Sequence, residues 1–148
     1  MPTHRIATEI GTRASPAQVW SVLTDFARYP QWNPFIREAE GEPLPGSRLK
    51  IRIQPPGQDG GMVFRPRVLR VEPEREFAWL GHLIVPGLFD GEHCFHIEPL
   101  PGGGCRVRQS ENFSGLLVPL FRKSLDGGTR QGFEAMNAAW VARAESTS

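Results

Sequence analysis

The sequence predicts a single-domain α+β fold in which a curved antiparallel sheet wraps around one long C-terminal helix. Its 148 residues are about the length of one domain. A strand pattern over 4–13 is followed by helix-start signals at 15–18, strands and turns fill 35–113, and helical spacing returns from about 125. A sheet with one apolar face needs a cover, and the last helix is the only expected element long enough to provide it.

The first expected elements are a strand and two short helices. Ile6 and Ile10 share one face of the strand. Ser15 is a helix N-cap, and Gln18 completes a capping box with it, so a helix begins here. A second short helix is expected to end at Pro30, because proline cannot continue a helix.

Six further strands with short connections are expected between 35 and 113. In the clearest of them Leu49, Ile51 and Ile53 alternate with basic residues, which is typical of a half-buried strand. With the first strand they form a sheet of six to seven strands. The expected strands are Phe35–Glu40, Arg48–Gln54, Met62–Val71, Glu76–His82, Glu92–Glu98 and Arg106–Phe113.

The C-terminal helix is predicted from apolar residues at helical spacing. Gly127 and Gly128 interrupt the pattern, since each glycine costs about 1 kcal/mol relative to alanine in a helix. We therefore expect either a kink there or a helix that begins after them. Small residues such as Gly132 leave room for a cavity between helix and sheet. The residues on the expected inner face are Leu125, Thr129, Gly132, Phe133, Met136, Asn137, Trp140 and Val141.

Composition excludes several classes of protein. The formal net charge is +1 and no basic stripe is present, which argues against a nucleic-acid-binding protein and against a polybasic membrane anchor. No apolar run approaches the roughly 18 residues of a transmembrane helix, so no integral membrane segment is expected. The N-terminus lacks the apolar core of a signal peptide and only two cysteines are present, so we expect a cytoplasmic protein with reduced thiols.

Several segments match one known superfamily in order and spacing. They are Ala14–Phe26, Tyr29–Phe35, the Pro45-Gly46 turn with the strand after it, Phe77–Gly81, Gly91–Phe95, Gly103–Arg106, Glu111–Gly115 and Gly132–Ala139. Over nearly its whole length the chain thus resembles the START-like (SRPBCC) superfamily, and within it the polyketide cyclase/dehydrase-like branch. The resemblance implies one helix-grip domain over residues 1–148. It implies no single activity, because this scaffold serves lipid carriers, cyclases, hydroxylase domains and chaperone regulators.

The expected inner face of the sheet carries polar groups among aromatic side chains. Alternation places His93 on this face, together with Gln109 and Glu111 of the next strand. A buried carboxylate needs a partner, and His93, Asn137 or an arginine of the Arg65/Arg67 pair are the candidates. Glu111 and His93 are candidate catalytic acid–base groups, and a satisfied structural role remains the alternative for both. The candidate ligand-binding residues are Phe77, Trp79, His93, Phe95, Gln109, Glu111, Phe113, Gly132, Phe133, Met136 and Trp140.

No metal site and no cofactor are expected. His93 and His96 are three residues apart and point to opposite faces of a strand. Cys94 shares a face only with His96, which leaves a zinc site two ligands short. We interpret Cys94 and Cys105 as small buried or edge thiols rather than as nucleophiles.

Two apolar runs, residues 83–89 and 116–121, occur where polar loops are expected. They predict a portal for an apolar ligand or the interface of a homodimer, with simple mutual packing as the alternative.

We predict that the chain binds a small hydrophobic molecule, such as a lipid, a polyketide-like molecule or an aromatic metabolite, between sheet and C-terminal helix. One alternative is a polyketide cyclase/dehydratase-type enzyme that transfers protons through Glu111 and His93. A second is a protein-interaction module.

Overall fold

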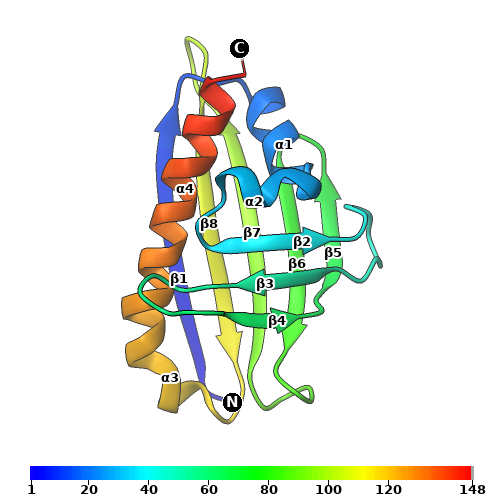
Figure 1. The fold of residues 1–148 in the computed structure, drawn as a ribbon, viewed down its shortest axis with the longest axis vertical. Helices are drawn as coiled ribbons and strands as arrows, with labels where there is room; N and C mark the ends of the chain where they lie inside the picture. The colour runs from blue at the N-terminus through cyan, green and yellow to red at the C-terminus, as the bar shows by residue number, and fades with distance from the viewer. Residues whose placement is uncertain (148) are drawn as a thin grey trace.

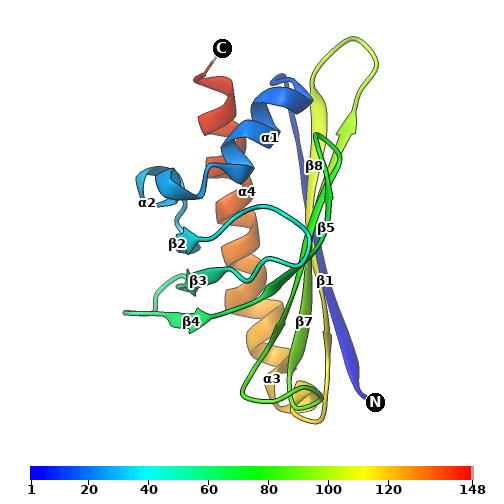
Figure 2. The same cartoon turned by 90° about the vertical axis from the view of Figure 1, so that its right-hand side faces the viewer.

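The computed structural model describes residues 1–147 and confirms the predicted fold class, with eight antiparallel strands and a long C-terminal helical segment (Figures 1 and 2). The chain begins with β1 (Thr3–Thr12), α1 (Pro16–Thr24), the 3-10 turn η1 (Phe26–Arg28) and α2 (Tyr29–Trp32). The strands that follow are β2 (Ile36–Glu40), β3 (Lys50–Ile53), β4 (Met62–Phe64), β5 (Arg67–Glu72), β6 (Glu76–His82), β7 (Asp90–Pro99) and β8 (Cys105–Ser114). The last elements are α3 (Val118–Ser124), η2 (Leu125–Thr129) and α4 (Arg130–Glu145).

The strands form two sheets, which corrects the expected single sheet of six to seven strands. One has the order β1-β8-β7-β6-β5 and the other the order β2-β3-β4. The expected strand Met62–Val71 is divided between them and turns a corner at Pro66, which has no N–H for the ladder. Backbone bonds from Leu49 N to the Pro66 carbonyl and from Val68 N to the Ser47 carbonyl, both 2.8 Å, join the sheets at this corner. In Figure 1 the smaller sheet crosses in front of the larger one.

The capping box predicted at the start of α1 is present. The Ser15 hydroxyl accepts from the backbone N–H of Gln18 at 3.2 Å, and the Gln18 side chain accepts from the backbone N–H of Ser15 at 2.7 Å. Val19, Val22 and Leu23 are the buried residues of the helix. The local sequence therefore begins this helix where it was expected, and its apolar side packs into the core.

The two glycines of the C-terminal helix neither delay it nor end it. Helix α3 begins at Val118, and the chain stays helical through Gly127 and Gly128 as the widened π-helical turn η2. Helix α4 then packs along β1 and against α1, where Trp140 Nε1 donates to the Val19 carbonyl at 2.9 Å. None of the helices in residues 1–147 has the length and apolar character to cross a membrane.

Candidate functional site

An apolar cavity of about 180 Å³ lies between the smaller sheet and part of the larger one. This corrects the predicted place between sheet and C-terminal helix, because the helical segment reaches the cavity only through Leu125 and Thr129. Its walls come from β3 and β4 on one side, from β6, β7 and β8 on the other, and from the β6–β7 loop and η2 at one end. The cavity exists because the corner at Pro66 turns β3 and β4 across the larger sheet. Its lining residues are Phe35, Ile51, Ile53, Pro55, Gln58, Met62, Phe64, Pro66, Trp79, Gly81, His82, Leu83, Phe89, Gly91, His93, Glu111, Phe113, Leu125 and Thr129.

Aromatic side chains form much of the wall on the larger sheet. Trp79 and His93 lie directly opposite each other on β6 and β7, and their ring centroids are 5.0 Å apart. Phe89 of the β6–β7 loop packs on Phe113 of β8, with centroids 5.5 Å apart. A flat, apolar molecule would therefore find ring faces on this side of the cavity.

One polar pair, His93 and Glu111, interrupts this apolar wall. The two residues are paired across β7 and β8, and His93 Nδ1 lies 3.3 Å from Glu111 Oε1. The His93 side chain is 1% exposed and that of Glu111 is 16% exposed. Gly91 makes room for the carboxyl group, because a Cβ atom at this position would collide with Glu111 Oε2.

A chain of buried hydrogen bonds fixes the orientation of the His93 ring. His93 Nε2 lies 2.8 Å from Gln109 Oε1, and Gln109 Nε2 donates to Asn137 Oδ1 at 2.9 Å. The Phe133 carbonyl lies 3.5 Å from the same Gln109 nitrogen and is a weaker second acceptor for it. Asn137 Nδ2 donates to Thr8 Oγ1 at 2.8 Å, and the Thr8 hydroxyl donates to the Gln109 carbonyl at 3.0 Å. Gln109 Oε1 is thus an acceptor, and His93 Nε2 must carry a proton.

The second ring nitrogen of His93 consequently faces Glu111. When Nε2 carries the proton of a neutral imidazole, Nδ1 has only a lone pair. The contact with Glu111 Oε1 is then favourable only when a proton lies between the two atoms, on the ring or on the carboxyl group. Of the partners considered for Glu111, the structure places His93 beside it, while Asn137 bonds Gln109 and Thr8. The pair can hold a proton at the cavity wall and offer it to a bound molecule.

The predicted ligand-binding residues divide into two groups. Trp79, His93, Glu111 and Phe113 line the cavity. The others lie in the closed core beside it, and they are Phe77, Phe95, Gln109, Gly132, Phe133, Met136 and Trp140.

Several lining residues were missed by sequence reasoning, chiefly Phe35, Ile51, Ile53, Phe64 and Gly91, whereas Leu83 and Phe89 belong to the run predicted as a portal. Two signals could have found some of them. The alternation that predicted β3 already placed Ile51 and Ile53 on one apolar face. A glycine inside a strand, such as Gly91, often marks a close approach by another group.

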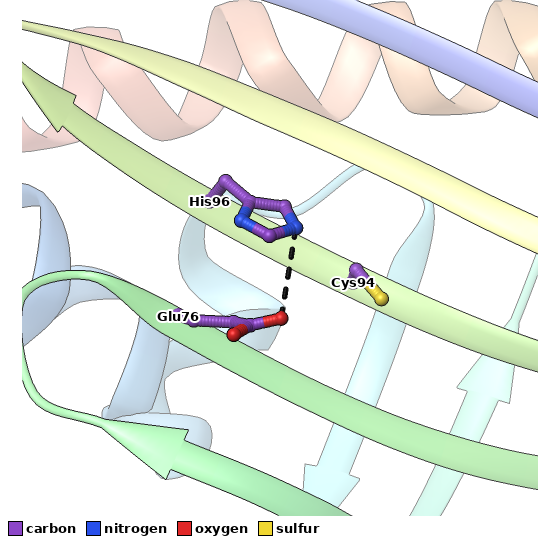
Figure 3. A group of neighbouring side chains, drawn as sticks. All are labelled: Glu76, Cys94 and His96. Atoms are coloured by element: carbon purple, nitrogen blue, oxygen red, sulfur yellow. Dashed lines mark ion pairs between the residues drawn. The ribbon is translucent and has the colours of Figure 1, made fainter.

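A second cluster of polar side chains lies on the outer face of the sheet (Figure 3). Ligand-type atoms of Glu76, Cys94 and His96 all lie within 4.8 Å of one another, and His96 Nε2 is 3.6 Å from Glu76 Oε2. Glu76 was missed from the sequence because it comes from the neighbouring strand. The Arg70 guanidinium already binds Glu76 at 3.2 Å and Glu92 at 2.8 Å. A metal ion would compete with this cation, so we interpret the cluster as an ion-pair network.

Both cysteines have the surroundings of inert thiols. Burial, with a further contribution from the neighbouring Glu92 carboxylate, raises the pKa of Cys94 to about 11. Burial also raises the pKa of Cys105, whose Sγ lies 3.4 Å from the Ala14 carbonyl. At neutral pH the Cys94 side chain is therefore a protonated thiol and a weak nucleophile.

Solved structures with this fold come from bacteria and plants. The chain matches the ZhuI aromatase/cyclase from Streptomyces sp. R1128 with a TM-score of 0.79 and 16% identity, over 97% of this chain and 94% of that one. A START superfamily protein from Mycobacterium smegmatis matches with a TM-score of 0.74 and 24% identity, over 98% and 99% of the two chains. Norcoclaurine synthase from Thalictrum flavum, in complex with dopamine and hydroxybenzaldehyde, matches with a TM-score of 0.73 and 17% identity, over 99% and 89%.

Sequence comparison gives the family. No curated protein matches this chain. The family model described as polyketide cyclase / dehydrase and lipid transport matches residues 3–145, which is nearly the whole length. The helix-grip architecture and the full-length structural matches agree with that assignment. The chain therefore belongs to the polyketide cyclase/dehydrase and lipid transport family.

Proposed function

We propose that the protein binds a small, largely hydrophobic molecule in the cavity between its two sheets, with one polar group of that molecule bonded to the His93–Glu111 pair. The observation that carries this proposal is an apolar cavity whose wall contains this buried polar pair. Pockets of this kind, apolar with a few polar groups that orient the ligand, are typical of small-molecule sites.

The size of the cavity favours a molecule with one ring in its bound part. An apolar cavity of roughly 150 Å³ is enough to hold benzene, and this one measures about 180 Å³. A single aromatic ring with a short substituent fits that space. A longer lipid or polyketide-like molecule would place one segment inside and the rest outside. The plant enzyme with the same fold, in complex with dopamine and hydroxybenzaldehyde, holds single-ring aromatic molecules.

Partly filling the cavity should weaken binding. A Cβ atom added at Gly81 would meet only Pro66 Cβ, at 3.7 Å, so the backbone accepts a side chain there, and Gly81→Val places methyl groups at the cavity wall. Indole and p-cresol should bind the parent protein saturably in a calorimetric or NMR titration, and at least roughly tenfold more weakly to this variant, a difference of ~1.4 kcal/mol. Gly11→Val is the matched control, because Gly11 lies on β1 with no atom within 4 Å of the added Cβ. Equal binding by both variants would contradict the proposed site.

A second candidate function is acid–base catalysis, favoured by the contact between His93 Nδ1 and Glu111 Oε1 at the cavity wall. In this reading the pair moves a proton to or from the bound molecule. Phenylacetone is a suitable probe, because it has one ring and acidic C–H groups beside a carbonyl. The parent protein should speed its hydrogen–deuterium exchange, and Glu111→Gln should lower that rate by about 10²–10⁴-fold. If the parent protein binds phenylacetone but does not speed its hydrogen–deuterium exchange, acid–base catalysis is excluded and only the binding function remains.

A cytoplasmic location and the absence of a nucleic-acid partner stay predictions from composition. The interaction-module alternative is less favoured, because it required a filled core and the core has a cavity.

A further inference from the structure

One end of the molecule carries an apolar tip, which we define as the β6–β7 loop, residues 83–89, together with residues 116–121 at the start of α3. Both segments lie at the same end of the molecule in both views (Figures 1 and 2). Backbone bonds join them, from Leu116 N to the Gly87 carbonyl at 3.1 Å and from Leu117 N to the Leu88 carbonyl at 3.0 Å. The tip is therefore one connected surface rather than two independent loops.

Large apolar side chains of the tip project into solvent. Ile84 is 84% exposed, Leu120 75% and Leu116 69%, and Val85 and Phe121 are also exposed. Single exposed apolar residues are ordinary on a protein surface, but a cluster of large ones marks a contact with another molecule or with a membrane. Mutual packing of the two runs therefore explains only part of their apolar character.

The backbone at Ile84 adds an independent observation. Its φ angle is 67°, in the left-handed region that glycine and asparagine tolerate and that β-branched residues rarely adopt. The side chain gains no burial in return. Neither packing nor backbone preference explains an isoleucine at this position, and such strained residues tend to cluster at functional surfaces.

Two basic residues follow the tip on α3, whereas Asp90, which follows the β6–β7 loop, has a side chain only 16% exposed and accepts from the Gly87 N–H. The tip contains no charged residue, and the two that follow it directly are Arg122 and Lys123. The nearest acidic residues are engaged, since Asp90 lies 2.7 Å from His82 Nδ1 and Asp126 lies 2.7 Å from His4 Nε2. Exposed apolar side chains flanked by basic ones match the surface of an anionic bilayer, where apolar groups insert and cations meet lipid headgroups.

We propose that the apolar tip inserts into the surface of a lipid bilayer that contains anionic phospholipids. A second copy of this chain fits less well, because a standard stable interface uses roughly 20–30 residues on each side and the tip offers five exposed apolar side chains. The sequence has no polybasic run, so insertion of the apolar side chains supplies most of the binding. The cavity walls adjoin the tip through Leu83, Phe89 and Leu125, so a hydrophobic ligand could pass between bilayer and cavity at this end.

Vesicle co-sedimentation of the ligand-free protein tests the proposal. The protein should sediment with phosphatidylcholine–phosphatidylglycerol vesicles more strongly than with phosphatidylcholine vesicles. Ile84→Asn and Leu120→Ser should each weaken this binding by roughly tenfold, because each removes a large apolar side chain from the inserted surface. Ile84→Asn should keep or raise the melting temperature, because asparagine tolerates the left-handed backbone. Joint replacement of Arg122 and Lys123 by glutamine should remove the preference for anionic vesicles.

The controls separate this proposal from the function of the cavity. Leu44→Ser removes a leucine that is 53% exposed on the β2–β3 loop, outside the tip, and should leave vesicle binding unchanged. Gly81→Val should also bind vesicles normally, because it alters the cavity wall alone. Failure of the parent protein to sediment with either vesicle would overturn the proposal. So would unchanged binding by Ile84→Asn and Leu120→Ser, or a dimer in sedimentation equilibrium that both substitutions abolish.

Discussion

Replacement of Gly132 by alanine should lower the free energy of unfolding by about 1–3 kcal/mol, the usual cost of overpacking a core. A Cβ atom on this residue of α4 would collide with the ring of Phe35. That ring is buried and packs against Phe133 with centroids 5.6 Å apart, so it can move only into the cavity and at the expense of this packing. The collision outweighs the helix propensity of alanine, which favours it over glycine by about 1 kcal/mol. Thermal unfolding should report a lower midpoint, by about 2–4 °C for each kcal/mol.

Gly127→Ala is the matched control for this prediction. It makes the same substitution in the same helical segment, but no atom lies within 4 Å of the added Cβ. It should therefore be neutral or stabilise the protein by up to about 1 kcal/mol, because alanine restricts the unfolded chain and favours a helix. A Gly132→Ala variant as stable as Gly127→Ala would contradict the close contact between α4 and Phe35. Because Phe35 also lines the cavity, Gly132→Ala should weaken indole binding as well.

Local sequence signals predicted most of the fold. Ser15 and Gln18 begin α1 through hydrogen bonds within one turn, and strand alternation placed His93 and Glu111 on the same face of neighbouring strands, where the structure pairs them directly. The corner at Pro66 was not predicted, because a proline inside a strand pattern is consistent both with a turn and with a weak point in one strand. That corner decides how many sheets form, and its bonds join residues about twenty positions apart in sequence.

The candidate site was predicted only on the wall that belongs to the larger sheet. Alternation assigns residues to a face, so it identified Trp79 and Phe113. It cannot distinguish residues of one face that meet helix α4 from those that meet the cavity, which is why Phe95 and Gln109 were grouped with them. The opposite wall, with Ile51 among its residues, depends on how the smaller sheet folds across the larger one.

Replacement of Asn137 by leucine should lower the free energy of unfolding by about 1–3 kcal/mol, although the two side chains have the same branched shape and the same number of heavy atoms. The side chain is 2% exposed, accepts from Gln109 Nε2 and donates to Thr8 Oγ1. Leucine can do neither, and a buried donor or acceptor without a partner costs its full desolvation energy. Denaturant unfolding measures the loss. The control Asn112→Leu removes an exposed asparagine that bonds the Arg5 guanidinium, and its effect should stay within about 0.5 kcal/mol.

The same substitution tests whether the buried chain orients His93. In the Asn137→Leu variant only the Phe133 carbonyl remains beside Gln109 Nε2, at 3.5 Å, so the amide can turn over and present its NH₂ group to the histidine. The His93 proton would then no longer be confined to Nε2, and the ¹⁵N resonances of its ring should change from one tautomer toward a mixture. In a double-mutant cycle with Gln109→Leu the two losses should be non-additive by about 0.5–3 kcal/mol, because both side chains belong to one network. Additive losses with an unchanged His93 tautomer would mean that Asn137 only fills the core and does not orient His93.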